Sequence, residues 1–247
     1  MDWDDMWASD LGLPVTLPPN NATLLRPLDE AGAAGAVARL RSFFGANPGG
    51  GFQIWSPWPT PDLSPLGFQR FELPLMIRPA GGELAAPPAG LEVSLVRTPA
   101  ALLQAERVLM DAYEVSGALS AQPRHSWDAR LLSRPEFAVF LALESEVPMA
   151  TLTAFAGSGL NGLINVATTP AARGRGVGAA LVAAAISHRP ELPAYIPALP
   201  AARASYQRLG FAEAGTFTIW ESQTRSAGSP WSSALGLSPS DPHAPPS

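Results

Sequence analysis

Cysteine and lysine are both absent from the 247-residue chain. Without cysteine the protein has no disulfide, no thiol nucleophile and no thiolate ligand for a metal. Without lysine it cannot contain a phosphate-binding P-loop, which requires a lysine directly after its last glycine. All fixed positive side-chain charge is therefore carried by arginine.

Charged residues are also scarce, at 15% of the chain. The net charge is −5, and a negative net charge argues against nonspecific binding to nucleic acid. No apolar run approaches the roughly 18 residues of a membrane span. The acidic start, Met1–Met6, lacks the pattern of a signal peptide. The three histidines are scattered without paired acids, so no metal site is predicted. We therefore expect a cytoplasmic protein with no metal, nucleic-acid or membrane partner.

The most informative stretch runs from Gly162 to Val182. Its apolar run at residues 163–167 predicts a buried strand, and a turn at residues 168–170 leads through a glycine- and arginine-rich segment into an alanine-rich helix. Glycines before a helix let a ligand approach the backbone, and the first N–H groups of a helix have no partner within it. This stretch predicts a phosphate-binding turn.

A dinucleotide-binding turn is one alternative, because Gly174, Gly176 and Ala179 satisfy its relaxed pattern. However, residues 168–173 separate the strand from the first glycine, whereas that pattern places the glycine at once. The next predicted strand, at residues 194–199, also ends at Pro200 and not at an acid that could bind a ribose. The spacing disfavours a nicotinamide-dependent dehydrogenase.

A second pattern lies at Arg173-Gly174-Arg175-Gly176-Val177-Gly178, within a wider match from Val166 to Gly178. Downstream, Ala202, Tyr206, Gly210 and Phe211 keep the spacing A-x-x-x-Y-x-x-x-G-F. Together these residues resemble the GNAT superfamily of acetyl-CoA-dependent N-acetyltransferases. One position departs from the family pattern: Leu199 stands where an asparagine is usual.

The resemblance implies a role for each matching residue. Acetyl-CoA would be the acyl donor, and backbone N–H groups of Val166, Ala167 and Thr168 would contact its acetyl carbonyl and pantetheine arm. Its pyrophosphate would bind the turn, and Tyr206 would protonate the leaving thiolate as the catalytic acid. The residues expected to bind pyrophosphate are Arg173, Gly174, Arg175, Gly176, Val177, Gly178 and Ala179. No general base is apparent, although Asp111, Glu114, His125 and Glu144 are possible; a water chain could also remove the proton.

The predicted elements over residues 91–221 follow the order of a GNAT fold, an α/β (α+β) arrangement with a mixed, twisted central sheet flanked by helices. We expect an N-terminal arm at 1–19, a linker at 80–90 and a disordered tail at 222–247. Residues 20–79 are interpreted as a degenerate GNAT-like half-domain, because Leu66-Gly67-Phe68 and Leu209-Gly210-Phe211 each follow a strand and helix and precede a strand. Two unrelated turns are an equal alternative.

The expected function is transfer of an acetyl group to a primary amine of a small molecule or peptide, by a monomer or homodimer. The alternative is a non-catalytic, acyl-CoA-binding regulatory protein, which the Leu199 departure and the missing base favour. Trp55 and Trp58, among prolines, could line the acceptor pocket or simply pack in the core. The acceptor amine is left open.

Overall fold

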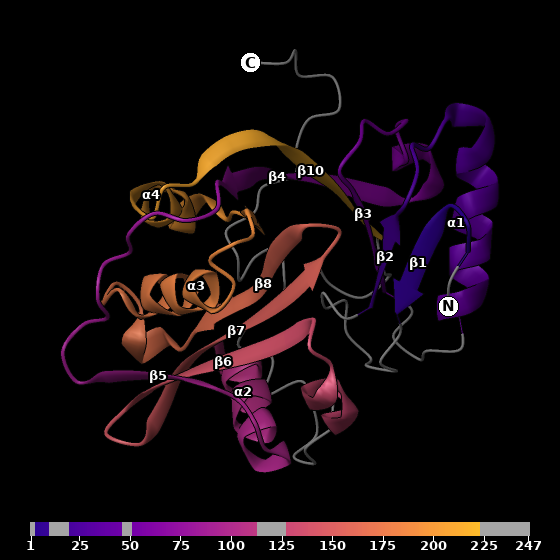
Figure 1. Ribbon diagram of the computed structural model, residues 1–247. Helices are drawn as coiled ribbons and strands as arrows, with labels where there is room; N and C mark the ends of the chain where they lie inside the picture. The colour runs from indigo at the N-terminus through magenta and orange to yellow at the C-terminus, as the bar shows by residue number, and fades with distance from the viewer. Residues whose placement is uncertain (1–2, 10–19, 46–50, 113–126, 223–247) are drawn as a thin grey trace. The chain divides into compact units, whose positions relative to one another are not determined.

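The computed structural model describes residues 3–9, 20–45, 51–112 and 127–222 (Figure 1). The chain splits into two compact units, the first comprising residues 1–74 and 215–247 and the second residues 75–214. Two long strands, β4 (Phe68–Arg78) and β10 (Ala212–Ser222), contribute residues to both units. Compactness does not show that a segment folds alone, so the domain boundaries expected from the sequence stay a prediction.

The second unit is a mixed sheet with the strand order β4-β9-β8-β7-β6-β5. Adjacent strands of this sheet are antiparallel, except for β8 and β9, which are parallel and are joined by a helix. The alanine-rich helix predicted after the glycine- and arginine-rich segment is confirmed at residues 177–188. The elements of this unit, besides the end of β4, are β5 (Leu91–Leu95), α2 (Pro99–Ala112), β6 (Phe137–Glu144), β7 (Val147–Gly157), β8 (Leu160–Thr168), α3 (Val177–His188), β9 (Ala194–Pro197) and α4 (Pro200–Arg208).

Helices cover both faces of this sheet (Figure 1). On one face, α3 and α4 pack over a core that includes Leu152, Leu163 and Leu181, each with no exposed surface. On the other face α2 packs through Leu102, Ala105 and Val108 against β6. The small alanine side chains of α3 let that helix lie close to the sheet, and burial of each leucine contributes about 2 kcal/mol. This packing holds the start of α3 next to the end of β8.

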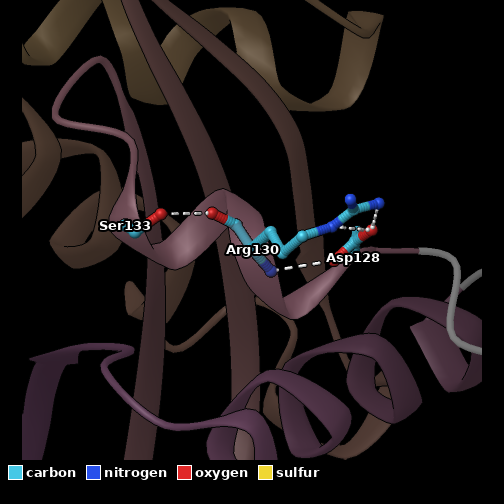
Figure 2. Close-up of polar contacts among 3 residues, drawn as sticks. All are labelled: Asp128, Arg130 and Ser133. Atoms are coloured by element: carbon cyan, nitrogen blue, oxygen red, sulfur yellow. Dashed lines mark hydrogen bonds and ion pairs between the residues drawn. The ribbon is translucent and has the colours of Figure 1, made fainter.

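A short 3-10 helix, η2 (Ala129–Ser133), leads into β6, and its own side chains stabilise it (Figure 2). The Asp128 carboxylate accepts hydrogen bonds from the Arg130 backbone N–H and from its Nε, both at 2.8 Å. The Ser133 hydroxyl donates to the Arg130 carbonyl at 2.7 Å. The hydrogen bonds from Arg130 lower the pKa of Asp128 to about 2, so this cap stays charged at all ordinary pH values.

The first unit has the strand order β1-β2-β3-β10-β4 and one long helix, α1 (Glu30–Phe44). Asp29 caps this helix by accepting a hydrogen bond from the Gly32 N–H at 2.7 Å. The core of the first unit is aromatic, and the ring of Phe44 stacks on that of Phe52 with 4.5 Å between the centroids. The other strands are β1 (Met6–Ser9), β2 (Asn21–Leu24) and β3 (Gln53–Ser56). Residues 6–9, which belong to the expected N-terminal arm, pair as a strand with β2.

The two units repeat one succession of elements. In each, two parallel strands are joined by a helix: β2, α1 and β3 in the first, and β8, α3 and β9 in the second. Each succession ends at a glycine with positive φ, Gly67 (81°) or Gly210 (86°), followed by a buried phenylalanine and a long strand. These likenesses favour the half-domain interpretation, which remains a proposal.

Each unit completes its sheet with a strand from the other half of the sequence. In the first unit β3 pairs with β10, and in the second unit β9 pairs with β4. Pro74 lies directly before the residues of β4 that pair with β9, Leu75–Arg78. A proline at this point removes no N–H from that ladder.

The tail expected at residues 222–247 lies outside the described residues except for Ser222, which is the last residue of β10. Among the helices that are described, none combines the length and the apolar character needed to cross a membrane.

Candidate acyl-transfer site

The strand β8 is irregular at the point where the sequence predicts acetyl binding. Its pairing with β7 joins Ile164 to Thr153 and Ala167 to Thr151, so Asn165 and Val166 together lie opposite Leu152 alone. This is a β-bulge, and Asn165 adopts a positive φ of 53° there. Asparagine tolerates this conformation better than most residues. The bulge turns the backbone of β8 immediately before Val166, Ala167 and Thr168.

The strands β8 and β9 also separate just before the bulge. Among the described residues their pairing covers Asn161 with Ala194 and Gly162 with Tyr195, and it does not extend to residues 163–168. The second half of β8 thus pairs with β7 and not with β9, which leaves one edge of its backbone outside the ladder. Backbone groups along that edge are available to an extended ligand.

The glycine- and arginine-rich turn follows directly. A 3-10 turn, η3 (Pro170–Ala172), leads into Gly174 and Gly176, which both have positive φ, 75° and 79°. Gly176 is the N-cap of α3 and no side chain caps the helix among the described residues. The first hydrogen bond within the helix runs from Ala180 N–H to the Gly176 carbonyl at 3.0 Å. The preceding N–H groups of the helix start therefore point out of its end, where the helix dipole favours an anion.

The start of α3 also lies against the end of β8. A Cβ placed on Gly178 would be 3.2 Å from the Thr168 hydroxyl oxygen and 4.0 Å from Val166. Gly178 thus permits this close contact, whereas a Cβ on Gly174 would meet nothing within 4 Å. The start of α3 and the end of β8 are therefore in direct contact, and the space above Gly174 is open.

The two arginines of the turn have different surroundings. Arg173 donates from its side chain to the Ala112 carbonyl at 2.7 Å and to the Thr168 carbonyl at 3.4 Å, and its backbone N–H donates to the Pro170 carbonyl at 3.3 Å. These bonds tie the turn to the end of α2. Arg175 forms an ion pair with Glu144, and both side chains remain partly exposed. The positive charge of Arg175 precedes the N-terminus of α3 and is accessible to a ligand.

Tyr206 lies in α4 and is 6% exposed. Its ring packs against Phe211 at 6.0 Å between centroids, and it belongs to the same core as Val177 and Ala198. Leu199, the departure from the family pattern, is the N-cap of α4, and this helix start has no side-chain cap. The departure therefore removes a capping side chain at a position where asparagine is favoured.

The candidate general bases are not brought together in the described part of the chain. Glu114 and His125 lie outside the described residues. Glu144 is paired with Arg175, and Asp111 is exposed on α2. Trp55 and Trp58 belong to the first unit, where Trp55 packs against Phe217 and Trp58 against the aromatic core. Within the described residues, no group of three or more His, Asp or Glu is placed to hold a metal ion.

Sequence reasoning did not identify Asn165, Tyr195 or the tethering role of Arg173. Asparagine tolerates the positive φ that a bulge can require, and a glycine inside a strand, here Gly162, often marks a close contact. The Arg173 tether depends on the end of α2, which no local pattern predicts.

Comparison with known proteins agrees with this geometry. Residues 135–213 match the family model described as an acetyltransferase (GNAT) domain. No curated protein matches the chain. The mixed sheet, with β8 antiparallel to β7, also differs from the parallel sheet of a dinucleotide-binding fold. The segment that contains the glycine-rich turn and Tyr206 therefore matches a GNAT acetyltransferase domain.

Several solved structures share the fold over most of the chain. A GCN5-related N-acetyltransferase from Kribbella flavida is 22% identical, with 83% of this chain and 82% of that chain covered and a TM-score of 0.59. An acetyltransferase of the GNAT family from Novosphingobium aromaticivorans is 16% identical, with 91% of each chain covered and a TM-score of 0.54. A functionally unknown conserved protein from Staphylococcus epidermidis is 12% identical, with 91% and 93% covered and a TM-score of 0.60. These matches include residues of both units.

Proposed function

We propose that the protein transfers an acetyl group from acetyl-CoA directly to a primary amine of a small molecule or peptide. One observation carries this proposal: the bulge of β8, its separation from β9 and the uncapped start of α3 follow one another along a single backbone. An extended thioester with a pyrophosphate at its far end matches this succession of an open strand edge and an anion site.

In this proposal the N–H groups of Gly174, Arg175, Gly176, Val177, Gly178 and Ala179 bind the pyrophosphate, and Arg175 adds a positive charge. The backbone of Val166, Ala167 and Thr168 binds the pantetheine arm and the acetyl carbonyl. A preset N–H donor at that carbonyl stabilises the negative charge that develops on its oxygen, and one such donor contributes about 3 kcal/mol.

The acceptor amine, in its neutral form, attacks the carbonyl carbon of the thioester, and the new C–N bond replaces the C–S bond. The nitrogen loses a proton to water, and Tyr206 donates its hydroxyl proton to the departing sulfur. In this proposal the acceptor loses its first proton to solvent before or during binding. A cytoplasmic location and a monomer or homodimer are part of this proposal.

Thermal unfolding tests the donor. At a concentration about a hundredfold above its Kd, acetyl-CoA stabilises the folded protein by about 2.7 kcal/mol, which raises the Tm by roughly 5 °C or more. NADH at the same concentration should leave the Tm unchanged. If acetyl-CoA produces no shift, the proposal is wrong.

A matched pair of variants places the binding site. Gly174 and Gly81 have nearly equal φ, 75° and 74°, and an added Cβ would meet nothing within 4 Å at either position. Gly174→Ala and Gly81→Ala therefore carry similar backbone strain. Gly174→Ala should reduce the acetyl-CoA shift because its methyl group enters the space above the turn, and Gly81→Ala should preserve it. Equal shifts in both variants would contradict binding at the turn.

A further inference from the structure

The face of the second unit's sheet opposite α3 carries an apolar strip beside the point where β8 and β9 separate. Phe155 pairs with Gly162, Gly162 pairs with Tyr195, and Tyr195 pairs with Ile77, so these residues form one row across four strands. Ile164 lies two residues beyond Gly162 on the same face. We call Ile77, Phe155, Ile164 and Tyr195 the apolar strip.

Part of this strip is open to solvent. Phe155 is 50% exposed and Ile164 is 43% exposed, which is unusual for large apolar side chains in the middle of a sheet. The helix α2 packs on the same face against β6 and, through Leu109 and Ala112, against Ala167 at the end of β8. The strip begins where that cover ends, at Ile164, which directly precedes the bulge residue Asn165.

Tyr195 crosses β8 because Gly162 has no side chain. A Cβ on Gly162 would be 2.6 Å from the Tyr195 hydroxyl oxygen, so the phenol lies flat over this glycine. Within the described residues the hydroxyl has no hydrogen-bond partner. Burial raises the pKa of Tyr195, so the hydroxyl remains neutral. The apolar strip therefore combines apolar surface with one uncharged polar group, the Tyr195 hydroxyl.

The strip contains no acidic residue that could bind a second positive charge. Its members from β4, β7, β8 and β9 are aliphatic or aromatic, and Thr153, which pairs with Ile164, is also uncharged. Polycationic amines require carboxylates in their binding sites, since a buried ammonium without a partner is strongly unfavourable. An amine attached to an aliphatic or aromatic body loses apolar surface to the strip instead.

We infer that the apolar strip is the wall of the acceptor site and that the acceptor is a primary amine on an uncharged, apolar body. This inference rests on the proposed function. It also bears on the missing base: an apolar wall disfavours the ammonium form, so desolvation lowers the pKa of the bound amine toward the pH of the solution. The acceptor then reaches the bulge as the neutral nucleophile without a carboxylate to remove its proton.

Two amines of equal size test this inference. Hexylamine and cadaverine have the same number of non-hydrogen atoms and differ in that a terminal methyl group is replaced by a second ammonium. With the full-length protein and acetyl-CoA, kcat/KM for hexylamine should exceed that for cadaverine by roughly tenfold or more, the range that apolar pockets achieve for such differences. Equal values, or a preference for cadaverine, would overturn the inference.

Phe155→Glu then places a carboxylate on the strip. Because Phe155 is half exposed, this change should leave the protein folded, and the acetyl-CoA shift in Tm verifies this. The variant should lose about tenfold in kcat/KM for hexylamine and reverse the preference toward cadaverine. Leu25→Glu is the matched control, since Leu25 is 47% exposed and lies in the first unit. It should retain the wild-type preference.

The failures can be told apart. If acetyl-CoA does not shift the Tm of the wild-type protein and neither amine is acetylated, the proposed function itself fails. If acetyl-CoA binds but Phe155→Glu leaves the ratio of the two amines unchanged, only the acceptor inference fails. If Phe155→Glu instead converts a dimer to a monomer in light scattering with an unchanged ratio, the strip is an interface between copies of the chain, which also overturns the inference.

Discussion

The guanidinium of Arg173 binds the last residue of α2, donating from Nη2 to the Ala112 carbonyl at 2.7 Å. The same side chain reaches the Thr168 carbonyl at the end of β8 at 3.4 Å. One arginine therefore holds a helix end, a strand end and the glycine-rich turn together. Its positive charge also lies at the C-terminal end of α2, where the helix dipole favours it.

Arg173→Met should weaken acetyl-CoA binding because the glycine-rich turn is no longer held in position, and not because a contact with phosphate is lost. A hydrogen bond from a charged donor contributes about 1.5–3 kcal/mol, so the Kd should rise by about tenfold or more. Because the lost contact is internal, the dependence of log Kd on log salt should equal that of the wild type. Arg189→Met is the control, since Arg189 also donates to a backbone carbonyl, that of Pro135, at the other end of α3. A flatter salt dependence in Arg173→Met would show instead that Arg173 binds phosphate directly.

Glu144→Gln should strengthen acetyl-CoA binding. Glu144 pairs with Arg175 in the turn, and as an exposed pair it contributes less than about 1 kcal/mol to stability. Removing the carboxylate frees Arg175 and removes a negative charge near an anion site, so the Kd should fall severalfold at low salt and less at high salt. Glu146→Gln makes the same change of charge in the turn between β6 and β7, and it should have the smaller effect on the Kd measured by titration calorimetry. Equal effects would mean that net charge alone matters.

Tyr206→Phe separates the catalytic protein from an acyl-CoA-binding regulator. The substitution keeps the ring that packs against Phe211 and removes the hydroxyl, so the fold and the acetyl-CoA shift in Tm should be preserved. Loss of a general acid lowers kcat by roughly a hundredfold or more. Turnover is measured by release of free CoA with the preferred amine. A variant with wild-type kcat would exclude Tyr206 as the acid, and a wild-type protein without turnover on any amine would favour the regulator.

Thr153→Val should stabilise the protein, whereas Thr151→Val should destabilise it. Both threonines are buried in β7, at 2% and 0% exposure. Among the described residues the Thr153 hydroxyl has no hydrogen-bond partner, but the Thr151 hydroxyl donates to the Phe140 carbonyl at 3.1 Å. Removing an unsatisfied buried hydroxyl relieves its desolvation, and removing a bonded one loses the bond, each by about 1 kcal/mol. Urea unfolding of the two variants measures the difference, and equal changes in the same direction would contradict this account.

Tyr195 should make the protein less stable at alkaline pH. Burial raises its pKa above the ordinary value of 10.0 in the folded chain, while the unfolded chain keeps the ordinary value. The stability contribution is fully present below that pH and is lost as pH rises toward the folded-state pKa, because the unfolded chain releases the proton first. Tyr195→Phe should unfold with a shallower alkaline decline in urea titrations at a series of pH values. The same variant should also lack a late-titrating phenol in ultraviolet difference spectra.

Most of the fold could be predicted from local patterns. The helix at residues 177–188 is bounded by Gly176 at its start and Arg189 and Pro190 at its end, and the structure places it at those residues. The strand at residues 137–144 likewise ends at a turn with positive φ at Ser145 and Glu146. Such elements carry their own start and stop signals, so sequence alone defines them.

The partnerships between strands could not be predicted in this way. Nothing local in residues 68–78 indicates that their last part pairs with β9, because that pairing joins segments far apart in the sequence. The same limit applies to the site: the glycine turn is a local pattern, but the Arg173 tether and the Tyr195 ring over Gly162 arise from tertiary contacts. The roles assigned to the turn, the bulge and Tyr206 remain predictions for the experiments above.

The pairing of β9 with β4 has a practical consequence for truncated proteins. A fragment that starts at residue 91 would contain the matched family segment, residues 135–213, but would lack Leu75–Arg78. The outer edge of β9 would then expose unpaired N–H and C=O groups, and an exposed edge of this kind recruits strands from other chains. Such a fragment should aggregate at concentrations where one starting before residue 75 stays dispersed.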